Sequence, residues 1–107
     1  MPNIKFNYLY RDASNYKNFN SIIFNNQQNI ELSVLDELIR SKLISHHWFY
    51  VHEWQVPDLH FNTWNNELDH TFHEFESIEY TDEAANSEKD LTSFTQMLEK
   101  LNISLYL

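Results

Sequence analysis

The sequence predicts one α+β domain whose mostly antiparallel sheet of about four strands carries two helices on one face. Segments with alternating apolar and polar residues are interleaved with segments whose apolar residues recur at helical spacing, in the order β-β-α-β-β-α. With 107 residues, 42% of them hydrophobic, the chain suffices for one hydrophobic core. Helices on one face of a sheet are the usual solution for this order of elements. No repeat or linker interrupts the pattern, so we expect residues 1–107 to form a single domain.

The first two strands are predicted to form a hairpin. Residues 3–11 alternate, which places Ile4, Phe6, Tyr8 and Tyr10 on one face of a strand and the intervening residues on the other. Residues 12–15 have the composition of a turn, and residues 16–24 supply the returning strand.

A helix is predicted over residues 34–44. Ser33 is a suitable N-cap, and the apolar residues that follow it recur at helical spacing. Arg40 and Lys42 fall in the last turn, where the helix dipole favours cations.

Two further strands are predicted in the middle of the chain. Residues 46–54 are rich in aromatic and β-branched residues on both faces, which is typical of a central strand. Residues 70–80 fit a strand only with a β-bulge, because Phe72, Ile78 and Tyr80 share a face and Phe75 does not. A helix that aligns Leu68, Phe72 and Phe75 is the alternative for this segment.

A final helix is predicted to begin after Ser87. Its apolar stripe consists of Leu91, Phe94, Leu98 and Leu101. Residues 102–107 are expected to form either a short edge strand or a frayed tail.

The absence of two residue types excludes several classes of site. Without cysteine, the chain has no disulfide framework, thiolate zinc site or cysteine nucleophile, and a cytoplasmic location is expected. Without glycine, it has no glycine-rich phosphate-binding loop, and its turns must use Asn, Asp and Ser. A net charge of −9 argues against nucleic acid and anionic membranes as partners.

Charge is distributed unevenly along the chain. Residues 43–88 contain ten carboxylates and no Lys or Arg. This pattern is typical either of a solvated acidic face or of a surface that binds a basic protein. Our hypothesis is a small acidic non-enzymatic protein-binding module of the immunity, inhibitor or anti-defence kind, with a homodimer left open. Its partner-binding candidates are acidic or aromatic: Glu53, Trp54, Asp58, Trp64, Glu74, Glu76 and Glu79. Trp54, Trp64 and Tyr106 are the candidates for an exposed aromatic patch.

The alternative hypothesis is a metal-dependent or acid–base enzyme. All six histidines lie between residues 43 and 88, and His70, His73 and Glu74 would share one face of a helix and could bind zinc. On a strand, His70 and His73 would point to opposite faces and the site would fail. Glu74 and Glu76 on one strand face would lie about 7 Å apart, a separation compatible with acid–base chemistry. No residue is assigned a catalytic role from sequence, and no cofactor is expected.

Overall fold

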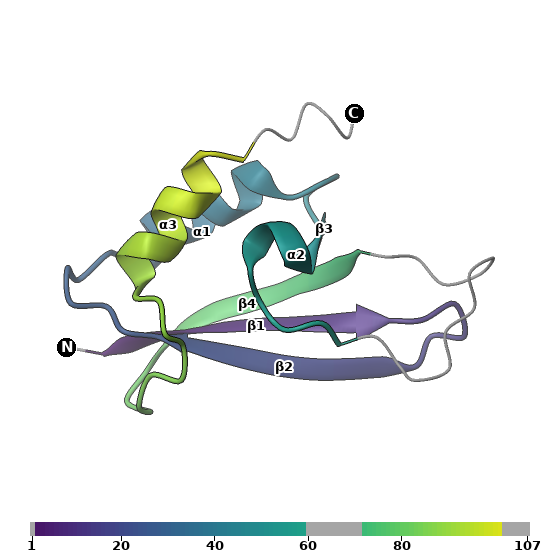
Figure 1. Cartoon of the computed structure of the whole chain (residues 1–107), viewed down its shortest axis with the longest axis horizontal. Helices are drawn as coiled ribbons and strands as arrows, with labels where there is room; N and C mark the ends of the chain where they lie inside the picture. The colour runs from purple at the N-terminus through teal and green to yellow at the C-terminus, as the bar shows by residue number, and fades with distance from the viewer. Residues whose placement is uncertain (1, 60–71, 102–107) are drawn as a thin grey trace.

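The computed structural model describes residues 2–59 and 72–101, which form one antiparallel sheet with helices on one side (Figure 1). The strands are β1 (Asn3–Arg11), β2 (Lys17–Phe24), β3 (Trp48–Phe49) and β4 (His73–Thr81). The helices are α1 (Leu32–Lys42), α2 (Val51–Trp54) and α3 (Leu91–Glu99). The strand order in the sheet is β2-β1-β4-β3. The predicted α+β class and the four-stranded antiparallel sheet are therefore confirmed, although the order of elements differs in detail.

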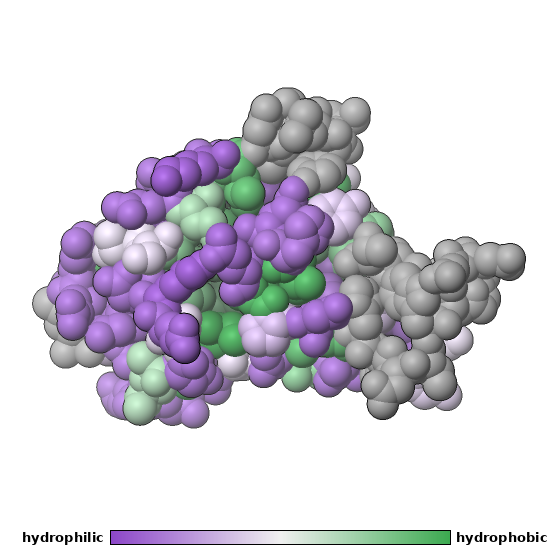
Figure 2. Space-filling view, in the orientation of Figure 1, coloured by the Kyte–Doolittle hydropathy of each residue, from purple (hydrophilic) through white to green (hydrophobic). Residues whose placement is uncertain are grey.

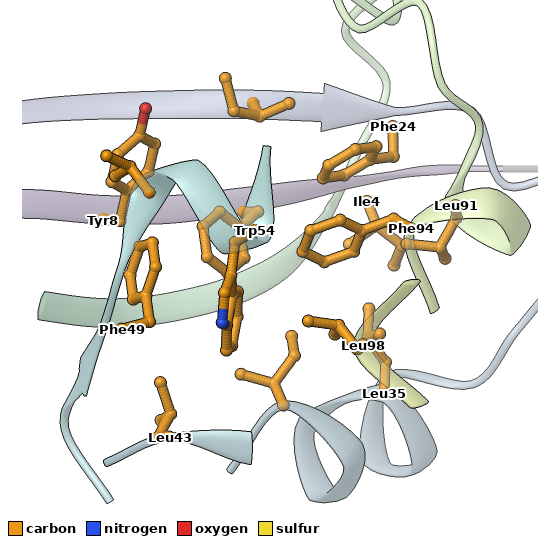
Figure 3. Packing of buried hydrophobic residues seen from close by; sticks show 14 of the residues in the cluster. Ile4, Tyr8, Phe24, Leu35, Leu43, Phe49, Trp54, Leu91, Phe94 and Leu98 are labelled. Atoms are coloured by element: carbon orange, nitrogen blue, oxygen red, sulfur yellow. The ribbon is translucent and has the colours of Figure 1, made fainter. Parts of the chain in front are cut away.

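The core lies between the sheet and the helices. Ile4, Phe6, Tyr8 and Tyr10 alternate along β1, and all four are at most 1% exposed, as the period of two predicted. Aromatic rings fill much of the space: Phe24 stacks on Phe94 with ring centroids 4.5 Å apart. Figure 3 shows these rings facing the aliphatic side chains of α1 and α3. The helix side of the sheet is thus the buried side.

The hairpin turn works without glycine. Asp12 accepts hydrogen bonds from the backbone N–H groups of Ser14 and Tyr16, and Asn15 adopts φ 67°. Asn and Asp tolerate such turns because their short side chains bond to the local backbone. Asn29 and Ser45 also have positive φ, as the composition predicted, but so do His46 and Gln55.

The predicted strand over residues 46–54 is wrong for most of its length. Only Trp48–Phe49 pairs with β4, and the one-turn helix α2 follows. Val51 and Trp54 are both buried against the core. In a strand, residues three apart point to opposite faces, whereas one turn of helix places both on the same side. The core therefore selects a helix where local composition favours a strand.

The segment with two alternatives is a strand, with the expected bulge. β4 pairs with β1 from Thr81 to Glu74, and its register shifts where Asn7 opposes Ser77 and Tyr8 opposes Phe75. The extra residue is Glu76, which has no register partner on β1. This shift turns Phe75 toward the core, where its ring lies 5.5 Å from that of Phe6.

The two predicted N-caps are displaced. α1 begins after Glu31 rather than after Ser33, and no side chain caps it. α3 begins after Asp90, whose carboxylate accepts a hydrogen bond from the backbone N–H of Ser93 at 2.9 Å. Ser87 instead accepts from the N–H of Lys89. The predicted tail strand at 102–107 lies outside the described residues, and none of the helices in the described part could cross a membrane.

Candidate protein-binding surface

The side of the sheet that faces away from the helices, here called the outer face, carries the side chains that alternate with the core residues. One row of register partners crosses all four strands and contains Trp48, Glu74, Leu9 and Phe19. A second row contains Ser77, Asn7 and Ser21, and a third contains Glu79, Lys5 and Ile23. In the described part of the chain, no helix lies over this face.

The first row is apolar at both ends. Phe19 is 57% exposed, and Trp48 is half-buried against the ring of Phe72 at a centroid distance of 5.2 Å. Leu9, between them, is only 6% exposed although it points away from the core. Partly exposed rings grouped on one face are typical of interfaces.

Glu74, in the middle of this row, forms an ion pair with Arg11, which lies two residues beyond Leu9 on β1. The Nε of Arg11 donates to Oε1 of Glu74 at 2.8 Å, and the Nη2 donates to Oε2 at 3.3 Å. Nη1 of Arg11 also donates to Asn15 in the turn at 2.6 Å. This two-pronged geometry fixes both side chains across neighbouring strands. The charge of Glu74 is thereby matched locally by β1.

The second row is a hydrogen-bonded chain of neutral groups. The hydroxyl of Ser21 donates to Oδ1 of Asn7 at 2.6 Å, and the Nδ2 of Asn7 donates to Ser77 at 3.1 Å. This chain links β2, β1 and β4 across the centre of the outer face. It separates the apolar row from the charged end of the sheet.

Residues 82–86 cross the charged end of the outer face. The Nζ of Lys5 donates to Glu83 at 2.9 Å, and Asn3 donates to the backbone carbonyl of Glu83 at 3.0 Å. The hydrogen bond from Lys5, reinforced by one from Thr81, holds the pKa of Glu83 below its usual value. The same hydrogen bond, together with the charges of Glu83 and Glu79, raises the pKa of Lys5. Glu83 is exposed and Lys5 is half-buried at the surface, so this pair shapes the charge of the surface more than the stability of the fold.

Three exposed carboxylates on and just after β4 remain without a salt bridge within residues 2–59 and 72–101. They are Glu76 at the bulge, Glu79 and Asp82. Within the described residues, positive charge interrupts the acidic half of the sequence, because Lys5 and Arg11 of β1 pair with Glu83 and Glu74. Of the three carboxylates without a salt bridge, Glu79 is placed on the outer face by its register with Lys5.

Those partner-binding residues predicted from sequence that the structure describes lie on both sides of the sheet. Glu74, Glu76 and Glu79 lie on β4, but Glu53 lies in α2 on the helix side. Asp58 is also on the helix side, where its carboxylate is 3.5 Å from the Nε2 of the inward-facing His73. Trp64 and Tyr106 lie outside the described residues.

The prediction that Trp54 belongs to an exposed aromatic patch is wrong. It is 1% exposed and packs on Phe49, with ring centroids 4.6 Å apart, and near Phe94 (Figure 3). The short helix α2 turns it into the core. Among the described residues, the exposed rings that sequence reasoning did not select are Tyr16, Phe19 and Tyr80. Of these, Phe19 lies on the outer face, because Asn18 and Asn20 on either side of it bond to Leu59 and Tyr8 on the helix side.

The structure separates two of the three residues proposed as metal ligands in the alternative hypothesis. His73 and Glu74 are consecutive residues of β4, so they point to opposite faces: His73 is fully buried and Glu74 lies on the outer face. The Nε2 of His73 accepts a hydrogen bond from the backbone N–H of Leu59 at 3.0 Å. His70 lies outside the described residues, and among those described no three His, Asp or Glu side chains come together to hold a metal.

A groove of about 260 Å³ lies on the helix side, between the edge of β2 and the segment after α2. Its floor is formed by Ile22, Phe24, Trp54 and Phe94, and Figure 2 shows apolar surface in this hollow. Among the described residues, Glu88 and Lys89 are its only charged lining groups. The groove therefore has an apolar floor with one acidic and one basic residue in its lining.

No family model, curated protein or solved structure matches this chain.

Proposed function

We propose that the protein is a small non-enzymatic binding module that contacts a basic protein partner through the outer face of its sheet. The observation that carries this proposal is the exposed carboxylate of Glu79 on the outer face, which also carries the partly exposed rings of Trp48 and Phe19. The exposed carboxylates of Glu76 and Asp82 lie three residues to either side of Glu79 in the chain. Apolar contacts would supply affinity, and the carboxylates would steer a positively charged partner.

The pairing of charges on this face supports the proposal. Arg11 and Lys5 already match Glu74 and Glu83, so a partner's cations would meet the three carboxylates that the fold leaves without salt bridges. Because those carboxylates are exposed, a partner need not break an internal ion pair to reach them. A cytoplasmic setting forms part of the proposal and is supported by the absence of cysteine.

The test is a capture experiment with cross-linking on the full chain and two variants of equal net charge. The site variant is Glu76→Gln, Glu79→Gln, Asp82→Asn, and the control variant is Glu31→Gln, Glu37→Gln, Glu99→Gln on the helix side. We expect the site variant alone to lose the captured protein, with cross-links to wild type mapping beside β4. Capture should also weaken between about 50 and 300 mM salt, as charge steering requires. Equal capture by the two variants, or cross-links confined to the helices, would overturn the proposal.

A further inference from the structure

The two long exposed edges of the sheet are built differently. β4 extends well beyond the two-residue β3, and its open stretch carries the bulge at Glu76 together with the charge of Glu79. Bulges and charges are common means of blocking strand addition. β2 lies at the opposite edge, and its pairing with β1 runs without a register shift from Phe24 to Lys17. Its sequence, Lys-Asn-Phe-Asn-Ser-Ile-Ile-Phe, contains a single charge and neither Pro nor Gly.

The backbone groups that β2 directs outward can be identified. Ile23 donates its N–H to Oδ1 of Asn86 at 2.8 Å, and its carbonyl accepts from the N–H of Asn86 at 3.0 Å, so both groups point away from β1. Because these directions alternate along a strand, the backbone N–H and carbonyl groups of Ser21, Phe19 and Lys17 also point away from β1. Asn86 thus occupies the outward backbone groups of Ile23, so a further strand cannot bond to them. Within the described part of the chain, the backbone of Lys17, Phe19 and Ser21 bonds to no other segment.

We infer that this protein forms a symmetric dimer in which the β2 edges of two copies pair antiparallel at residues 17–21. With Phe19 opposite Phe19 of the second copy, Lys17 lies opposite Ser21, and each opposed pair can exchange both hydrogen bonds of an antiparallel ladder. The result is one continuous sheet with four strands from each copy.

Charge and side-chain position single out a second copy as the occupant. The chain carries −9, yet the only charged residue in β2 is Lys17, so two copies can meet here without opposing carboxylates in the paired strands. The register places no like charges opposite each other. It also places Phe19, which is 57% exposed, beside its own counterpart on the outer face and extends the apolar row that includes Leu9. Self-complementarity of this kind is what a two-fold interface requires.

Sedimentation velocity on the full chain, from about 5 µM to about 1 mM, tests the dimer. The mass is expected to rise toward twice that of the monomer, and raising salt should tighten the dimer by screening the repulsion between acidic copies. The salt effect is opposite in sign to that expected for a basic partner. A monomer at every concentration and salt level would overturn the inference, because the β2 edges of two copies would then not pair.

Two matched pairs of variants locate the interface. Phe19→Lys is compared with Val34→Lys on α1, because the two residues are 57% and 58% exposed and receive the same charge. Only Phe19→Lys should weaken the dimer.

The second pair is Ser21→Lys and Ser21→Glu, which both lose the bond to Asn7. Ser21→Lys places a like charge opposite Lys17 of the second copy, and Ser21→Glu places an opposite charge there. We expect Ser21→Lys to dissociate about tenfold more readily than Ser21→Glu. Equal affinities in this second pair would rule out the proposed register even if Phe19→Lys failed to fold.

Discussion

On the helix side of β1, Ile4, Phe6 and Tyr8 are at most 1% exposed, whereas on its outer side Lys5 and Asn7 are half-buried and bonded to neighbouring strands. One strand thus supplies both faces of the sheet by alternation. Burying a large apolar side chain contributes about 1.5–3 kcal/mol, while a neutral hydrogen bond contributes about 1 kcal/mol. The helix side of the sheet therefore contributes more to the free energy of folding than the outer face does.

The largest effect should come from truncating a ring on the helix side. Phe6→Ala is expected to lower the free energy of unfolding by about 3–5 kcal/mol, because Phe6 contacts the rings of Phe49, Phe75 and Phe94 and would leave a cavity. Phe19→Ala, on the outer face, should cost less than about 1 kcal/mol. Urea unfolding followed by tryptophan fluorescence measures both. Similar losses for the two variants would erase the distinction between the faces.

An intermediate effect should separate two consecutive residues of β4. His73→Ala removes the acceptor of the Leu59 N–H from the buried side and is expected to cost about 2–4 kcal/mol. Glu74→Ala removes a partly exposed ion pair from the outer side and should cost less than about 1 kcal/mol. Denaturant midpoints at neutral pH provide the comparison. A greater loss for Glu74→Ala would show that the outer face contributes more to folding than we infer.

The smallest effect concerns the surface ion pair of Lys5 and Glu83. The pKa of Glu83 is depressed, so its contribution is present at neutral pH and is lost as pH falls through its folded-state pKa. The pKa of Lys5 is raised, so its contribution is lost only as pH rises through its own, in the alkaline range. In an NMR titration, Lys5→Met should move the Glu83 midpoint up toward that of an ordinary glutamate. Lys17→Met should leave it unchanged, and a midpoint insensitive to Lys5 would refute the pairing.

The hairpin and the bulge show how far local pattern reaches. The alternation from Ile4 to Tyr10 predicted the buried face of β1, and the misaligned Phe75 predicted the bulge in β4. Both follow from the period of a strand, which is a local property. The segment over residues 46–54 was mispredicted because both Val51 and Trp54 are needed in the core, and that demand comes from residues distant in sequence.

The candidate surface was predicted only in part. The carboxylates of β4 were identified from the missing Lys and Arg between residues 43 and 88, but nothing local indicates that Arg11 and Lys5 would lie beside Glu74 and Glu83. Those pairs join residues 63 and 78 positions apart. Likewise, Phe19 reads as one aromatic residue among many until its strand is found at the edge of the sheet.

By itself, the sequence determined which residues alternate, which segments can be strands or helices, and that the chain lacks the glycine and cysteine that many sites require. The tertiary structure alone decided that β1 lies between β2 and β4, and with it which charges are matched and which edge of the sheet stays open. The physical reason is that hydrophobic periodicity is set by neighbours in the chain. Charge pairing and edge exposure, in contrast, are set by neighbours in space.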